Sequence, residues 1–201
     1  MKKVLFFLIM LAVCLQNVSF AQSKKMSKAE REAAWRAERM KKRAAEEVLE
    51  HSEDSLYFVQ AIEAIRNGSW ALEASNITFN NGVTRFVTDS TNYISIDNGQ
   101  GVVQTAFDNA NVHSPNGLGG ITLEGDVSGE RMSRDKDGNV YYSYTIQGAN
   151  ISAIVYVTIT ANSNQASARI DPNFSGRTLT MNGYIYPYST AGVFQGTTSY
   201  Y

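Results

Sequence analysis

Cysteine, histidine and proline are scarce in this sequence. Its 201 residues include one cysteine, two histidines and three prolines. A disulfide framework needs paired cysteines, and a thiol-rich zinc module needs several Cys and His ligands, so both are excluded. We expect no metal site and no cofactor.

Charge of either sign is also sparse. Charged residues make up 18% of the chain and the formal net charge is −1. A soluble domain ordinarily has about 25% charged residues. The balance therefore excludes a basic nucleic-acid-binding protein and an acidic disordered chain. The length suits one globular domain with an appendage.

The first 21 residues have the pattern of an export signal. Lys2 and Lys3 precede an uncharged apolar run from Val4 to Leu15, and Ala21 ends a small-residue cleavage site. The run is shorter than the roughly 20 residues of a transmembrane helix. We predict cleavage after Ala21, a periplasmic or secreted protein, and no transmembrane span in the mature chain.

Lipid attachment is the alternative at this end of the chain. The segment Leu11-Ala12-Val13-Cys14 approximates a lipobox, which would place a lipid anchor at Cys14. Val13 is unfavourable there, because the residue before an acylated cysteine is normally small.

Residues 22–54 form a charged extension with helical composition. Nine basic and three acidic residues lie between Lys24 and Arg43. In 46–54 all charged residues are acidic, and His51 is the one other titratable residue. A capping box at Ser27 and Glu30 predicts the start of a helix.

A thin stripe of small and apolar residues follows the extension at helical spacing, comprising Ala29, Ala33, Ala37, Met40, Ala44 and Val48. Three interpretations stay open: a solvated helix, a coiled-coil or partner-helix face, and attraction of the basic half to an anionic membrane.

Residues 55–201 are predicted to form a β-rich domain with a leading helix. Leu56, Val59, Ile62 and Ile65 recur at helical spacing, and Asn67-Gly68 is a stop signal. From residue 69 onward only 16 of 133 residues are charged, and apolar residues alternate with polar ones between Asn-Gly and Asp-Gly turns. Short connections favour antiparallel pairing. We expect a mainly β fold, an antiparallel β-barrel or sandwich of about eight to nine strands, with the amphipathic helix packed on it.

The segment Asn116-Gly117-Leu118-Gly119-Gly120-Ile121-Thr122 resembles a family of secreted proteins known as domain of unknown function 4251. Similar blocks occur at Asn92-Tyr93-Ile94, Asp137-Gly138-Asn139 and Phe174-Ser175-Gly176-Arg177. The resemblance covers roughly residues 55–195 and the export signal. It implies an exported envelope protein of Bacteroidetes-type bacteria, and it implies no activity or catalytic residue.

Two groups of residues are candidates for ligand contact. Gly117, Gly119 and Gly120 precede a strand, where they permit either a bend or close approach of the backbone to a ligand, and His113 lies just before them. Tyr184, Tyr186 and Tyr188 alternate on the last predicted strand, where they could pack together or stack on a sugar or an apolar partner.

Three functional hypotheses follow. The first is a non-enzymatic module whose barrel interior or mouth binds a small apolar or glycan-like ligand. The second is a protein-interaction or structural module that uses the charged helix as a tether or docking element for an envelope protein. The third is a hydrolase using His113 or the pair Glu124 and Asp126. We expect that the protein is not an enzyme.

Overall fold

A computed structural model describes residues 26–107, 114–149, 152–173 and 176–198 of the chain. The chain divides into two compact units, Met1–Glu47 and Val48–Tyr201. The predicted export signal, Cys14 and His113 lie outside the described residues.

Helix α2 (Lys28–Arg66) begins at the predicted capping box. The Ser27 amide donates to Glu30 Oε2 at 2.7 Å, and the Glu30 amide donates to Ser27 Oγ at 3.2 Å. The bond from the Ser27 amide lowers the pKa of Glu30 below its ordinary value. The helix ends where Gly68 adopts a φ of 64° and its amide donates to the Ile65 carbonyl. Both predicted signals are confirmed.

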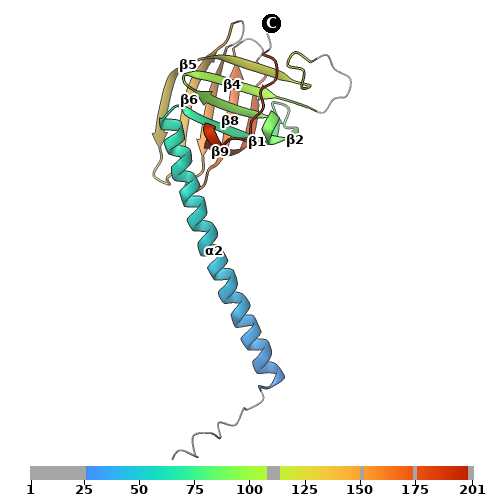
Figure 1. The fold of residues 1–201 in the computed structure, drawn as a ribbon, viewed down its shortest axis with the longest axis vertical. Coiled ribbons are helices and arrows are strands. Elements are labelled where there is room, and N and C mark those ends of the chain that lie inside the picture. Colours follow the sequence, from blue (N-terminus) through green and yellow to red (C-terminus); the bar gives the residue numbers. More distant parts are fainter. Residues whose placement is uncertain (1–25, 108–113, 150–151, 174–175, 199–201) are drawn as a thin grey trace, which may run out of the picture. The chain divides into compact units, whose positions relative to one another are not determined.

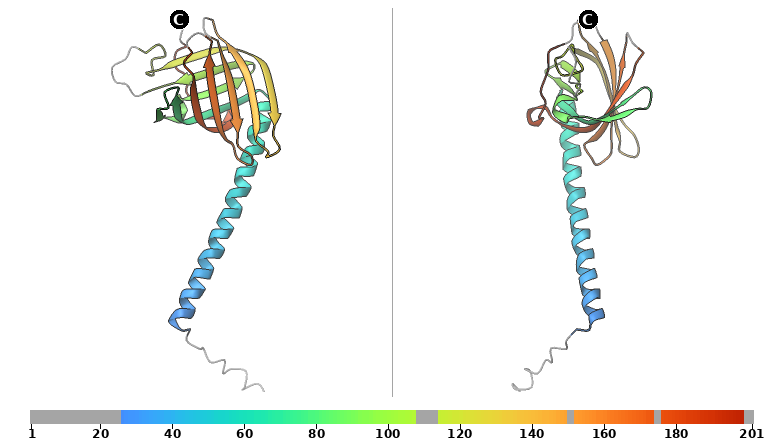
Figure 2. Two further views of the ribbon diagram at one scale, coloured as in Figure 1. Left: turned by 180° about the vertical axis from the view of Figure 1, so that it is seen from behind. Right: turned by 90° about the vertical axis from the view of Figure 1, so that its right-hand side faces the viewer.

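The described residues form nine antiparallel strands: β1 (Ser69–Phe79), β2 (Thr84–Phe86), β3 (Tyr93–Asp97), β4 (Gln100–Thr105), β5 (Ile121–Arg134), β6 (Val140–Gln147), β7 (Ser152–Ile159), β8 (Gln165–Pro172) and β9 (Leu179–Pro187). Consecutive strands from β3 to β9 are neighbours, and β1 pairs with both β3 and β9. The eight strands β1 and β3–β9 therefore close a barrel, and β2 is an extra strand on β1 (Figures 1 and 2). The fold is the barrel rather than the sandwich.

Alternation along each strand divides the side chains between the barrel interior and its outside. On β6, Val140, Tyr142, Tyr144 and Ile146 are buried while their neighbours are exposed or half-buried. β5 is one continuous strand, and a bulge between Ser128 and Arg131 bends it instead of ending it.

The two ends of the barrel differ. At one end lie the β3–β4, β5–β6 and β7–β8 turns and the start of β1; we call this the helix end. Phe58, Ala61, Ile62, Ala64 and Ile65 of α2 are buried in the same core cluster as the barrel interior. The opposite end, where β4 and β8 end and β5 and β9 begin, is called the mouth. No helix within the described part of the chain is apolar and long enough to cross a membrane.

A C-terminal segment, residues 191–198, covers part of the outer surface of β4 and β5. Gln104 holds this segment: its Nε2 donates to the Phe194 carbonyl at 2.7 Å, and its Oε1 accepts from the Gly196 amide at 2.7 Å. Glu124 accepts from Gln195 at 3.0 Å and from Thr198 at 2.6 Å. Gln104 is therefore buried and Glu124 half-buried, and both are hydrogen-bonded to this segment.

Candidate functional site

The mouth of the barrel contains an open cavity of about 770 Å³. Its walls are the ends of β1, β4 and β8, the starts of β5 and β9, and the loop before β5. Side chains near its rim include Phe79, Phe107, Pro115 and Arg177. Small-molecule sites commonly occupy about 300–1,000 Å³ and occur in the mouths of β-barrels, so the size and the place suit a ligand.

A smaller apolar cavity of about 90 Å³ adjoins the first on the barrel side. The two share Thr105, Ile121, Pro172 and Leu179 as lining residues. The smaller one is otherwise lined by Val103, Leu123, Ala153 and Ile170, all apolar. Beyond it, buried side chains such as Ile94, Tyr144 and Met181 belong to one continuous core. A ligand would therefore occupy the mouth and not the whole interior.

The mouth is more apolar than polar. Phe79 lies at the end of β1 and Phe107 just beyond β4. Their ring centroids are 5.8 Å apart. Ile121 is 44% exposed, because its side chain faces the open mouth and not the filled core. Arg177 is the one charged residue among the described lining residues. These features suit an apolar molecule more than a sugar, which would need several hydrogen-bond partners.

Two of the predicted glycines border this cavity, and the structure shows why they are glycines. A Cβ on Gly119 would lie 2.0 Å from the Phe107 carbonyl oxygen, and one on Gly120 would lie 2.0 Å from the Thr105 carbonyl oxygen. The backbone of Gly119 and Gly120 lies so close to the backbone of Phe107 and Thr105 that neither glycine position has room for a side chain. Gly117 has a φ of 72° and supplies the preceding turn.

Asn116 fixes the loop that carries these glycines. Its Oδ1 accepts from the amides of Leu118 at 3.0 Å and Gly120 at 3.1 Å, and its Nδ2 donates to the Thr105 carbonyl at 2.9 Å. The side chain is 2% exposed. Because the loop is tied to β4 by a buried amide, this rim of the mouth is formed before any ligand arrives.

The predicted tyrosines lie away from the mouth. Tyr184 is 44% exposed on the outer side of β9, and Tyr186 is half-buried on the same side. Burial raises the pKa of Tyr186, with a smaller contribution from Glu73. Tyr188 was expected on the same strand, but it begins the 3₁₀ turn η2 (Tyr188–Thr190) after Pro187 ends β9. The three therefore do not form one ladder, and they do not join the glycines in one site.

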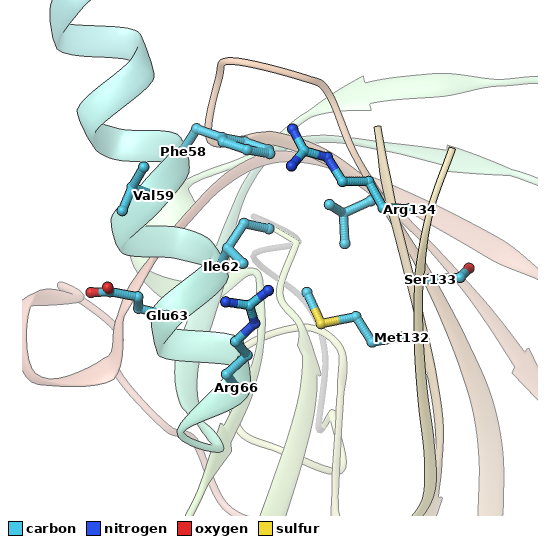
Figure 3. Close-up of a pocket in the computed structure, with 9 residues that line it drawn as sticks. Phe58, Val59, Ile62, Glu63, Arg66, Met132, Ser133 and Arg134 are labelled. Atoms are coloured by element: carbon cyan, nitrogen blue, oxygen red, sulfur yellow. The ribbon is translucent and has the colours of Figure 1, made fainter. Parts of the chain in front are cut away.

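A second cavity of about 400 Å³ lies at the helix end, between α2 and the hairpin of β5 and β6. Figure 3 shows Ile62 and Met132 facing each other across it, with Arg66 and Arg134 extending into the same space and Glu63 pointing away. The Arg134 guanidinium lies 5.6 Å from the centre of the Phe58 ring and its Nε donates to the Gly138 carbonyl. This cavity is a groove beside a packed helix. Of the two arginines that line it, Arg134 already contacts the Phe58 ring and the Gly138 carbonyl.

The acidic pair considered for catalysis is engaged elsewhere. Glu124 binds the C-terminal segment, and Asp126 accepts a hydrogen bond from Gln100 Nε2 at 2.5 Å. Within the described ranges no three His, Cys, Asp or Glu side chains converge in the manner of metal ligands.

Sequence reasoning missed the two phenylalanines and the buried amides that shape the mouth. Phe79 and Phe107 each stand beside a turn or loop at the end of a strand, and this is the signal that could have located them. Gln104 carried no such signal, since its partners Phe194 and Gly196 lie about 90 residues away in the sequence.

These features define a closed antiparallel β-barrel with one preformed, largely apolar mouth. Residues 52–185 match the protein family described as "Domain of unknown function (DUF4251)", and the chain belongs to this family. The resemblance seen in the sequence is thereby confirmed. The family description assigns no activity.

A solved structure is similar to this chain. It is the crystal structure of a DUF4251 family protein from Bacteroides eggerthii DSM 20697, with 38% sequence identity and a TM-score of 0.62. The match covers 72% of this chain and 96% of that chain. A comparison with curated proteins finds no match.

Proposed function

We propose that this protein is an exported envelope protein that binds a small apolar ligand in the mouth of its barrel, without catalysing a reaction on it. The observation that carries the proposal is the cavity of about 770 Å³, with an apolar pocket on its barrel side and a rim fixed by Asn116. Burial of an apolar ligand there would contribute roughly 25 cal/mol per Å² of apolar surface removed from water.

A fluorescent probe tests this binding. N-phenyl-1-naphthylamine, a neutral apolar dye, should bind with a stoichiometry of one per chain, and its fluorescence should rise on binding. Ile121→Asp places a charge in the mouth at a position that is already 44% exposed, so it should abolish the signal without unfolding the barrel.

Val83→Asp is the matched control. Val83 is 45% exposed and lies in the turn between β1 and β2, outside the residues that line the mouth. This variant should bind the dye as the unmodified protein does. Equal binding by all three proteins, or no binding by any, contradicts the proposal.

Export rests on the N-terminal sequence, and a mass measurement tests it. The proposal predicts that protein recovered from the envelope begins at Gln22, after removal of residues 1–21. A diacylglyceryl group on Cys14 would instead indicate a lipid-anchored protein, and an intact Met1 would indicate that the chain is not processed.

A further inference from the structure

The outer part of α2 has no covering partner in the described structure. Every residue from Met26 to Glu53 is exposed, including Met40 and Val48, which are each 71% exposed. Among the described residues of this stretch there is one ion pair, between Lys42 and Glu46 within the helix, at 3.8 Å. Most helices in proteins are stabilised by packing of an apolar face, because isolated helices are marginally stable in water.

Charge divides this helix into two complementary halves. Lys28 to Arg43 is predominantly basic, and Glu46 to Asp54 is acidic apart from His51. Two copies lying parallel would bring basic half against basic half and acidic half against acidic half. Two copies lying antiparallel would bring each basic half against the acidic half of the other copy, which is favourable.

We propose that this stretch of α2 binds a second copy of the same chain, with the two helices antiparallel and centred on Ala44. In this register Met40 of one copy lies opposite Val48 of the other, and Ala37 lies opposite His51. The paired residues are equally distant from Ala44 on either side, so the arrangement is two-fold symmetric.

The residues beside this apolar face have matching charges. Arg36, Arg43 and Glu47 each stand one position before a residue of the face, namely Ala37, Ala44 and Val48. Asp54 stands one position before Ser55, which continues the face at helical spacing four residues after His51. The four charged residues therefore line the same edge of the face. In an antiparallel pair, edges of the same kind meet. These edge residues are offset by two positions from the face pairs, and they converge because helical side chains lean toward the N-terminus. Arg43 therefore reaches Glu47 of the second copy and Arg36 reaches Asp54, which gives four charge pairs by symmetry.

Sedimentation velocity of the purified protein tests the pairing. A dimer should form at low salt, and its dissociation constant should rise by about tenfold or more when salt is raised to about 1 M, since exposed charges are screened. A protein that stays monomeric, or one recovered only with a different envelope protein on this helix, overturns the proposal.

Charge reversal gives the sharper test. The double variant Glu47→Arg/Asp54→Arg should be monomeric, as should Arg36→Glu/Arg43→Glu. An equimolar mixture of the two should form a heterodimer, because the opposite charges again face each other. Circular dichroism checks that each variant is folded. Two folded variants that do not associate when mixed contradict the register.

The control is Glu46→Arg/Glu53→Arg. It makes the same change of charge on the opposite side of the helix, at residues that are exposed. This variant should still form the homodimer. If it dissociates as completely as Glu47→Arg/Asp54→Arg, net charge and not the proposed edge controls association.

Disulfide trapping distinguishes the two orientations. In a Cys14→Ser background, Ala44→Cys should form an intermolecular disulfide, since residue 44 meets its own copy. Ala37→Cys should not, because the two copies of residue 37 would lie about 20 Å apart at 1.5 Å per residue. A disulfide at residue 37 would show a parallel pair. The pairing is independent of the mouth, so Ile121→Asp should leave it unchanged.

Discussion

Tyr142 and Tyr144 are adjacent inward-facing residues of β6, yet their hydroxyl groups differ. The Tyr142 hydroxyl donates to the Glu130 carboxylate, whereas the Tyr144 hydroxyl has no hydrogen-bond partner among the described residues. Burial raises the pKa of both tyrosines far above the ordinary value. A buried polar group without a partner reduces stability.

Replacement of tyrosine by phenylalanine should therefore affect the free energy of unfolding differently at these two positions. Tyr144→Phe should leave the free energy of unfolding unchanged or raise it, because it removes an unpaired hydroxyl. Tyr142→Phe should lower it by about 1–2 kcal/mol, because a hydrogen bond to a carboxylate is lost. Urea unfolding of both variants measures the difference. A larger loss in Tyr144→Phe would show that its hydroxyl has a partner such as a buried water.

Gly120 gives a second prediction at this scale. Gly120→Ala should lower the free energy of unfolding by about 1–3 kcal/mol, because its Cβ would overlap the Thr105 carbonyl and force the backbone apart. Gly192→Ala is the control, since the nearest atom to its Cβ would be Glu73 Oε1 at 3.8 Å. That variant should differ from the unmodified protein by at most about 0.5 kcal/mol. Thermal unfolding of the two variants decides whether the close approach is required.

At the scale of elements, Gln104 is one of the side chains that hold the C-terminal segment. Gln104→Leu should remove its hydrogen bonds to Phe194 and Gly196 and leave those backbone groups unpaired. Amide hydrogen exchange of residues 191–198 should become at least about tenfold faster, while β6 and β7 stay protected. Unchanged protection of the segment would show that Glu124 and its partners hold it without Gln104.

The start of α2 should depend on pH. Because the folded state lowers the pKa of Glu30, the capping bond contributes stability above the pKa of the unfolded chain, and this contribution is lost as pH falls through the lowered folded value. The protection of the Ser27 and Glu30 amides, measured against the intrinsic exchange rate at each pH, should therefore fall below about pH 4. Glu30→Gln should remove this dependence, and Glu32→Gln should retain it. Equal behaviour of the two variants would contradict the role of the cap.

Most of these elements could be predicted because their signals are local. Alternation in β6 and β7, the capping box at Ser27 and the stop at Gly68 each involve residues close in the sequence. Two features required long-range information. Closure depends on pairing of β1 with β9, about 110 residues apart. Burial of Gln104 depends on a segment about 90 residues away.

At the scale of the whole molecule, the chain has an eight-stranded barrel with an apolar mouth and a helix whose charges suit a second copy. The glycine block was predictable as a feature of the chain, but its place at the mouth was not. Gly119 and Gly120 border the cavity only because the loop after β4 folds back onto the start of β5. The tyrosines on β9 formed an equally plausible pattern in the sequence, and they lie towards the other end of the barrel.

Native mass spectrometry of the protein isolated from the cells that make it shows whether the mouth of the barrel holds a ligand. We expect a mass above that of the polypeptide by one small apolar molecule per chain, retained in Val83→Asp and absent in Ile121→Asp. Polypeptide mass alone in the unmodified protein, or the same bound mass in Ile121→Asp, would contradict ligand binding in the mouth.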